Sequence, residues 1–145
     1  MLVQGIYTLK NPSKYRGDVT RVTYRSSWEL RVMKILDDHP SINWWSSEEL
    51  IIRYLSPVDG RMHRYFPDFV INVTTRSKQT RTLVIEVKPH AQCSLPKPPK
   101  RQTPRYINEV KTFAVNQAKW KAAETFCLDH GWTFKVMTEK DLKIT

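Results

Sequence analysis

The sequence predicts a single α/β domain in which a mixed β-sheet meander is flanked by helices. Its 145 residues suit one domain, and 40% of them are hydrophobic, which is enough to form a core. Two segments carry helix start and stop signals. Between them, apolar runs alternate with turn residues, a pattern typical of antiparallel strands.

The charge balance predicts a polyanionic partner. Lysine and arginine number 24 against 14 acidic residues, which gives a net charge of +10. A small basic domain of this kind binds nucleic acid or an anionic membrane. No apolar run approaches the roughly 18 residues of a membrane span, and the first residues lack a secretory signal, so we expect no membrane association. Only two cysteines occur, Cys93 and Cys127, which excludes a disulfide scaffold and favours a reducing cytosol.

The first helix is predicted to follow a basic N-terminal arm. Residues 1–25 contain five cations and one acid and form a largely extended arm; the domain proper then spans residues 26–145. Ser26 and Glu29 have the spacing of a capping box, in which each side chain bonds to the other residue's amide. The helix ends before Pro40, because a residue that precedes proline avoids helical geometry.

The middle of the chain is predicted to form strands. The apolar and β-branched runs lie at residues 42–45, 50–55, 61–66, 69–73 and 82–88. Residues 56–60, with early proline and a late Asp-Gly pair, form a turn, and the polar residues 74–81 form a hairpin loop. These segments together predict a mostly antiparallel meander.

The last third of the chain predicts a loop, a long helix and a strand. Residues 89–104 contain five prolines, several cations and no acid, so they form an extended basic loop. A helix follows from about residue 105 to 130 and ends at Gly131. Residues 132–137 form a strand that can return parallel to the sheet after this crossover.

One constellation points to chemistry. Glu86 and Lys88 share a face of the strand 82–88, because strand side chains alternate. If this strand pairs with 69–73, Asp68 lies beside Glu86 near the open end of the hairpin. Adjacent carboxylates on an apolar sheet repel, and Mg²⁺ relieves the repulsion while accepting a backbone carbonyl as a further ligand. A metal-bound water can attack phosphorus, and Lys88 can orient or deprotonate that water or stabilise the charge that develops.

The same residues resemble a nuclease superfamily. Pro67-Asp68, seventeen intervening residues and Glu86-Val87-Lys88 are similar to the PD-(D/E)xK motif. The resemblance implies a restriction-endonuclease-like domain in which Asp68 and Glu86 bind Mg²⁺, or Mn²⁺ in its place. It implies that the Val87 carbonyl is a third ligand and that Lys88 assists catalysis. It also implies an acid on the preceding helix, and Glu29 occupies that position.

A longer series of segments, spread over most of residues 5–142, is similar to the head completion nucleases of tailed bacteriophages. The segments are 24–30 (YRSSWEL), 45–49 (WSSEE), 56–60 (SPVDG), 64–69 (RYFPDF) and 118–123 (AKWKAA). The resemblance implies endo- and exonucleolytic cleavage of DNA late in capsid assembly, around head–tail joining. It implies portal or neck proteins as partners and the host cytoplasm as the location.

The basic residues after the catalytic strand are predicted to contact DNA without regard to sequence. A stiff cationic loop grips phosphates, although a solvated connector would have the same composition. No recognition-helix motif occurs. Related nucleases often have a glutamine at the position of Gln117 that orients the phosphate or the metal water, but here the full Gln-x-x-x-Tyr pattern is missing. The predicted DNA-binding residues are Lys97, Lys100, Arg101, Arg105, Gln117 and Lys119.

The role of Glu29 and the identity of the third acid remain open. Glu29 serves as a metal ligand, as the partner of the Ser26 cap, or as both in turn. If it only caps the helix, the third acid is Glu48, Glu49 or Asp59, although the first two are expected on a solvated bend and Asp59 in its turn.

A second constellation, formed by two histidines and two cysteines, supplies the ligand types of a tetrahedral zinc site, although the sequence favours a simpler account. The residues are His90, Cys93, Cys127 and His130. The 33 residues between the cysteines exceed the usual spacing, and burial of Cys127 as a small apolar residue explains it more simply.

Two alternative functions stay open beside the phage nuclease. One is a structural adaptor that holds DNA ends at the capsid vertex with weak or no catalysis. The other is a junction- or end-cutting nuclease of the same superfamily. The sequence leaves the oligomeric state open.

Overall fold

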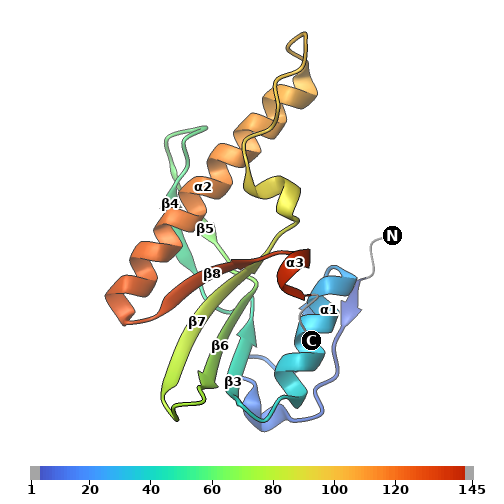
Figure 1. The fold of residues 1–145 in the computed structure, drawn as a ribbon, viewed down its shortest axis with the longest axis vertical. Helices are drawn as coiled ribbons and strands as arrows, with labels where there is room; N and C mark the ends of the chain where they lie inside the picture. Colours follow the sequence, from blue (N-terminus) through green and yellow to red (C-terminus); the bar gives the residue numbers. More distant parts are fainter. Residues whose placement is uncertain (1–3, 143–145) are drawn as a thin grey trace.

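A four-stranded mixed sheet forms the centre of the computed structural model, which describes residues 4–142 (Figure 1). Its order is β3 (Ile42–Ser47), β6 (Phe69–Thr74), β7 (Thr80–Val87) and β8 (Thr133–Met137). The first three strands are antiparallel, and β8 pairs parallel with β7. The predicted parallel return after the long helix is therefore confirmed.

The β6–β7 hairpin differs from the prediction in the length of its loop. We expected a loop over residues 74–81, but β6 includes Thr74, and β7 begins with Thr80, which pairs with it. Threonine suits strands because its branched side chain packs well on a pleated surface. The turn is left with residues 75–79, in which Lys78 adopts the left-handed φ of 65°.

Helix α1 (Ser27–Asp38) covers one face of this sheet together with the N-terminal segment. Ser26 is its N-cap and accepts a hydrogen bond from the Glu29 amide, so the predicted start is confirmed. The apolar face of α1 packs against side chains of β3, β6 and β7. The largest buried side chains of this cluster are Met33, Trp45 and Phe69.

The segment before α1 is a packed part of the domain, which differs from the predicted free arm. Its elements are β1 (Gly5–Ile6), the 3₁₀ turn η1 (Pro12–Lys14) and β2 (Thr23–Tyr24), which pairs with β1. Tyr7, Tyr15 and Val22 are buried in the cluster under α1. Two cations of this segment also contact the body: the Lys14 ammonium donates to the Asp37 and His39 carbonyls at 2.9 Å, and the Arg16 guanidinium lies 4.1 Å from the centre of the Trp44 ring. Residues 1–3 and 143–145 lie outside the described part of the chain.

A buried carboxylate fixes this segment to the end of α1. Asp37 is fully buried and accepts hydrogen bonds from the Tyr7 hydroxyl at 2.7 Å and from the amides of Lys10 and Asn11 at 2.8 and 3.0 Å. Burial raises the pKa of Asp37, but these hydrogen bonds outweigh it and hold the pKa below its usual value. Asp37 is therefore a charged group whose donors all come from the protein.

The other face of the sheet carries helix α2 (Pro104–His130) and a separate hairpin of β4 (Ile52–Leu55) and β5 (Met62–Tyr65). This hairpin is a two-stranded sheet of its own, so the predicted meander is divided in two. Its inner face packs on Trp120 and Ala123 of α2. The helix ends at Gly131, whose φ of 70° closes the cap as predicted.

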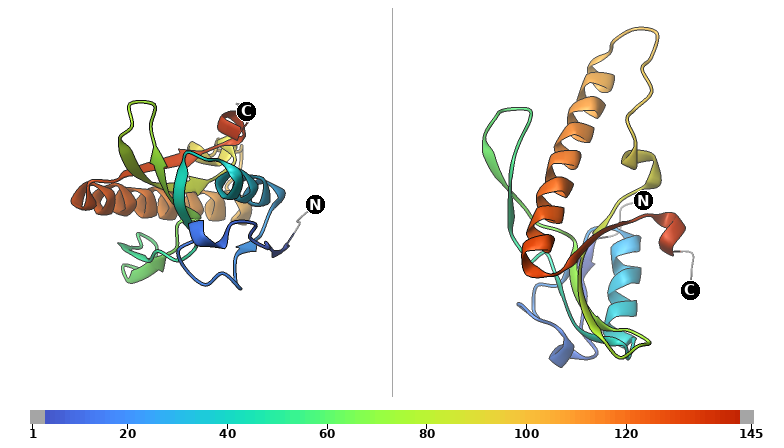
Figure 2. Two further views of the ribbon diagram at one scale, coloured as in Figure 1. Left: turned by 90° about the horizontal axis from the view of Figure 1, so that it is seen from below. Right: turned by 60° about the vertical axis from the view of Figure 1, so that its left-hand side comes forward.

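The N-terminal part of α2 projects from the body beside the basic loop (Figure 2). The residues of α2 that are buried begin at Asn116, so the preceding turns do not contribute to the core. The loop contains the 3₁₀ turn η2 (His90–Cys93), and a short helix α3 (Glu139–Leu142) follows β8. None of the helices within residues 4–142 is long and apolar enough to cross a membrane.

Candidate active site

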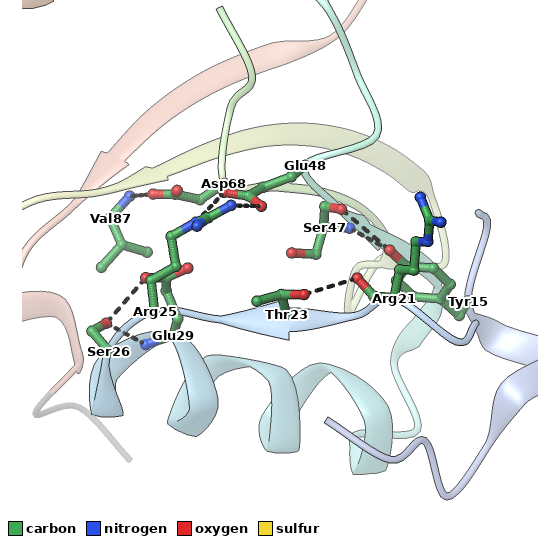
Figure 3. Close-up of polar contacts among 10 residues, drawn as sticks. All are labelled: Tyr15, Arg21, Thr23, Arg25, Ser26, Glu29, Ser47, Glu48, Asp68 and Val87. Atoms are coloured by element: carbon green, nitrogen blue, oxygen red, sulfur yellow. Dashed lines mark hydrogen bonds and ion pairs between the residues drawn. The ribbon is translucent and has the colours of Figure 1, made fainter. Parts of the chain in front are cut away.

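Asp68 and Glu86 lie side by side at the open end of the β6–β7 hairpin, as the sequence predicted. Phe69 pairs with Ile85, which places the preceding Asp68 across from Glu86. The Asp68 carboxylate accepts a hydrogen bond from the Val87 amide at 2.8 Å (Figure 3). Glu86 is only 6% exposed and accepts a hydrogen bond from the Tyr65 hydroxyl at 2.9 Å.

The surroundings of Asp68 disfavour its charged form. Burial, the charge of Glu86 and a hydrogen bond with Glu86 raise the pKa of Asp68 well above its usual range. The Val87 amide and the charge of Lys88 oppose this shift without cancelling it. Burial and the Glu86 charge also raise the pKa of Tyr65, which therefore stays protonated and remains a donor. Without a cation, the raised pKa favours the protonated form of Asp68.

A cluster of three acids lies on the other side of Asp68. One carboxylate oxygen from each of Glu29, Glu48 and Asp68 lies within 4.8 Å of the others. They come from α1, from the end of β3 and from the start of β6. Burial, the Asp68 charge and the Glu48 charge raise the pKa of Glu29, although the Ser26 hydroxyl opposes the shift. We call Glu29, Glu48, Asp68 and Glu86 the acidic cluster.

Glu48 lies on the predicted bend, but it is half-buried and belongs to the acidic cluster. It is a non-glycine residue with a left-handed φ of 54°, a strained conformation that is common at functional sites. Arg25 holds its carboxylate with two hydrogen bonds of 3.1 Å, and its amide donates to the Asp68 carbonyl at 3.2 Å. The pairing of Ser47 with Phe69 brings it beside Asp68. Glu48 was one of three candidates for the third acid, but its pairing beside Asp68 could not be predicted because β4 and β5 separate the two strands.

Glu29 takes part both in the helix cap and in the acidic cluster. The Ser26 hydroxyl accepts a hydrogen bond from the Glu29 amide and donates one to the Glu29 carboxylate, both at 3.2 Å. Within the described residues, the Ser26 amide makes no hydrogen bond to that carboxylate, so only half of the predicted capping box forms. The other side of the carboxylate is left to face Asp68.

Two lysines stand next to the carboxylates. Lys88 follows β7, its amide donates to the Met137 carbonyl at 2.9 Å, and its charge acts on Asp68. No ion pair between Lys88 and Glu86 occurs in residues 4–142, so a simple cross-face pair does not explain either residue. Lys119 was expected on the helix surface but is half-buried, with its ammonium 5.6 Å from the ring centre of Tyr65. Burial lowers its pKa, although the Glu86 charge opposes the shift.

The other predicted DNA-binding residues are exposed. Lys97, Lys100 and Arg101 lie in the basic loop, and Gln117 lies on the surface of α2. Arg105, in the first turn of α2, pairs with Glu109 at 3.1 Å. Their contacts with DNA stay predictions, as does the Val87 carbonyl as a metal ligand.

The rival acids have partners elsewhere. Glu49 accepts hydrogen bonds from the Tyr15 hydroxyl at 2.9 Å and the Asp18 amide at 3.2 Å, so it fastens the N-terminal segment. Asp59 accepts a hydrogen bond from the Arg61 amide at 2.9 Å and serves its turn, as expected.

The four residues considered for zinc do not come together. Among the described residues, the acidic triad of Glu29, Glu48 and Asp68 is the one group of three or more that could hold a metal ion. Cys127 is buried against Val70 and Val84, as the simpler reading expected. The His130 ring stacks on Phe126, and the Cys93 thiol donates to the Pro89 carbonyl.

Comparison with known proteins agrees with this geometry. The sequence model of the family described as TnsA-like endonuclease N terminal matches residues 39–139. The Head completion nuclease of Enterobacteria phage T4 is 36% identical over 147 residues, which cover 99% of this chain and 95% of that protein. No solved structure matches the chain. The matched range contains Glu48, Asp68, Glu86 and Lys88, while Glu29 lies before it.

Proposed function

The chain belongs to the TnsA-like endonuclease family of the PD-(D/E)xK superfamily and to the phage head completion nucleases, and on that premise we propose that its acidic cluster supports Mg²⁺-dependent hydrolysis of DNA. The observation that carries the proposal is the convergence of four carboxylates from α1, β3, β6 and β7 on one end of the sheet. Such a cluster is unfavourable by itself and becomes favourable with a divalent cation.

The residues present fit magnesium. The cluster offers carboxylate oxygens, which hard cations such as Mg²⁺ and Mn²⁺ prefer, and none of its four members is a histidine or cysteine. Asp68 would be the shared ligand, since it lies beside Glu86 on one side and beside Glu29 and Glu48 on the other. The Val87 carbonyl is the proposed backbone ligand.

The chain's own groups prepare this site for phosphodiester hydrolysis. A bound Mg²⁺ supplies charge for the phosphate oxygens and acidifies a water molecule. The Val87 amide orients Asp68, Tyr65 orients Glu86, and Arg25 orients Glu48. Lys88 and Lys119 bring positive charge to the place where the pentacovalent phosphate develops negative charge. We assign Lys88 the proton transfer or charge stabilisation, because it adjoins Asp68.

The same proposal covers the substrate and the setting. The exposed cations of the basic loop and α2 bind DNA phosphates without regard to sequence. The relative's name supports a role in head completion, and we propose action on DNA in the host cytoplasm during virion assembly, beside portal or neck proteins. Both endo- and exonucleolytic cleavage are proposed.

Plasmid cleavage tests the proposal. Wild-type protein should nick and linearise plasmid DNA with Mg²⁺ or Mn²⁺ and lose this activity in EDTA. Asp68→Asn should abolish cleavage and leave DNA binding intact or stronger, because it removes a ligand and a negative charge. The matched control is Asp59→Asn, which makes the same change in an exposed turn and should keep wild-type cleavage.

The alternatives give different results in the same assay. A structural adaptor would bind DNA ends without metal-dependent cleavage in the wild type. A junction- or end-cutting enzyme would cleave branched DNA or free ends and leave closed plasmid intact. Full activity in Asp68→Asn would remove Asp68 from the site.

A further inference from the structure

The basic loop and α2 enclose a groove beside the acidic cluster. Its volume is about 660 Å³, and residues 91–97 of the loop line it opposite one face of α2. The helix residues run from Arg105 to Asn116, about 16 Å along the axis at 1.5 Å per residue. Figure 2 shows the loop following the projecting part of the helix.

The inner end of the groove lies next to the acidic cluster. Asn116 is one helical turn before Lys119, so the two side chains share a face of α2. The Lys119 ammonium lies 5.6 Å from the ring centre of Tyr65, whose hydroxyl donates to Glu86, so this end of the groove approaches the acidic cluster. A chain that lay in the groove would therefore lead toward Asp68.

Asn116 is a polar side chain for which the folded protein provides no partner. It is only 5% exposed and lines the groove, yet none of the hydrogen bonds within residues 4–142 involves its carboxamide. The small accessible part of Asn116 opens into the groove, where its carboxamide is available to pair with a ligand.

The remaining lining has the chemistry of a nucleobase site. Asn108 and Gln92 add two more carboxamides, and Phe113 adds a half-buried aromatic ring. Carboxamides present a donor beside an acceptor and match base edges, while an aromatic ring stacks on any base. Lys97 and Arg105 stand at the outer end for the phosphates, and the acid there, Glu109, is paired with Arg105 at 3.1 Å.

We propose that this groove binds the unpaired bases of a single-stranded DNA extension and leads that strand to the acidic cluster. A duplex is excluded, because paired bases have no free Watson–Crick edge and a groove of this volume holds one or two nucleotides. The inference rests on the proposed nuclease function and adds to it a substrate preference for frayed or tailed DNA ends.

Fluorescence anisotropy in EDTA tests the groove without any cleavage. The probes are a labelled blunt duplex, the same duplex with a short single-stranded extension, and the same extension made of abasic residues. Wild-type protein should bind the extended duplex on the order of tenfold more tightly than the blunt one, from stacking and base-edge contacts. The abasic extension should lose that preference, because it keeps only the phosphates.

Substitutions in the groove test whether its residues cause the preference for the extended duplex. Asn116→Leu and Phe113→Ala should each reduce the ratio of extended to blunt affinity to within about threefold, from the loss of one partner or one stacking surface. The matched control Gln79→Leu replaces a carboxamide in the turn between β6 and β7 and should keep the wild-type ratio.

Two outcomes overturn the proposal, and both use wild-type protein: equal affinity for the extended and blunt duplexes, or equal affinity for the normal and abasic extensions. Asp68→Asn should keep the ratio while it loses cleavage. Loss of the ratio therefore rejects the groove, and retention of cleavage in that variant rejects the proposed active site.

Discussion

Asp37 is fully buried and Asp68 is half-buried, and the protein treats these two aspartates in opposite ways. Asp37, at the end of α1, receives three hydrogen bonds from the N-terminal segment, and its pKa is lowered. Asp68, at the start of β6, receives one from the Val87 amide and faces three other carboxylates, and its pKa is raised. Desolvation acts to raise the pKa of both carboxyl groups, so desolvation alone does not mark a functional acid. The two residues differ in the number of hydrogen-bond donors around the carboxylate. A carboxylate that has few protein donors and lies beside other carboxylates marks a cation site.

The largest effect is expected from Glu48, the cluster residue that Arg25 orients. Glu48→Gln should reduce plasmid cleavage by orders of magnitude and raise the Mg²⁺ concentration for half-maximal rate, because an amide is a poor Mg²⁺ ligand. The neighbouring Glu49→Gln is the control and should keep cleavage near wild type. Equal losses of cleavage in both variants would show that the effect of Glu48 does not come from its place in the acidic cluster.

Substitution of Glu29 distinguishes a role in helix capping from a role in metal binding. Glu29→Gln should keep the Tm of the metal-free protein within a few degrees or raise it, since the Ser26 hydroxyl still bonds to the amide of residue 29 and one repelling charge is gone. Cleavage should fall by orders of magnitude. Unchanged cleavage and unchanged metal dependence would make Glu29 a cap only.

Asp37→Asn tests the other half of the comparison. It should lower the free energy of unfolding by about 2–4 kcal/mol, because one buried and two partly buried donors lose a charged acceptor. Asp68→Asn should raise that free energy in EDTA, by on the order of 1 kcal/mol, because it removes a repelled charge. Urea unfolding of both variants in EDTA measures the two signs. A stability loss in Asp68→Asn as large as in Asp37→Asn would show that both aspartates stabilise the metal-free fold, which contradicts the comparison.

The pH dependence of stability follows from the same shifts. Asp37 has a lowered pKa in the folded protein, so its contribution is present above the ordinary Asp value of about 4 and is lost as the pH falls through the lowered pKa. Asp68 has a raised pKa, so its contribution is present below about pH 4 and is lost as the pH rises through the raised pKa. In EDTA, Asp37→Asn should flatten the acid side of the stability profile and Asp68→Asn the alkaline side. Unfolding by urea across the pH range checks this, and parallel profiles for the two variants would contradict it.

The smallest effect is expected from the basic loop, because its predicted role is to contact DNA phosphates and not to hold either aspartate. Replacing Lys97, Lys100 and Arg101 with alanine should weaken binding to all blunt duplexes alike. Each lost phosphate contact should reduce the slope of log K against log salt by about 0.9. Binding titrations at several salt concentrations measure the slope, and an unchanged slope would show that the loop is a connector.

Local signals in the sequence predicted much of this molecule. The Ser26 cap, Gly131 and the turn at residues 56–60 have short-range causes, and each was placed correctly. The neighbourhood of Asp68 and Glu86 followed from hairpin register, which is nearly local as well.

Long-range packing accounts for what the sequence did not predict. Glu48 reaches Asp68 only because β3 pairs with β6 across an inserted hairpin. Asp37 looked like the end of a helix, and its donors lie 26 to 30 residues away. The burial of Lys119 depends on the packing of α2 against the hairpin of β4 and β5. Pairing between distant segments leaves no periodic trace in one sequence.

Binding of Mn²⁺, followed by electron paramagnetic resonance, tests the central claim most directly. The claim is that the acids around Asp68 hold a divalent cation, while Asp37, whose carboxylate already has three protein donors, does not. Wild-type protein should bind Mn²⁺ at a site that Mg²⁺ competes for. Asp68→Asn should weaken this binding by at least tenfold, and Asp37→Asn and Asp59→Asn should leave it unchanged in folded protein. Mn²⁺ affinity that is the same in Asp68→Asn as in the wild type would contradict the account.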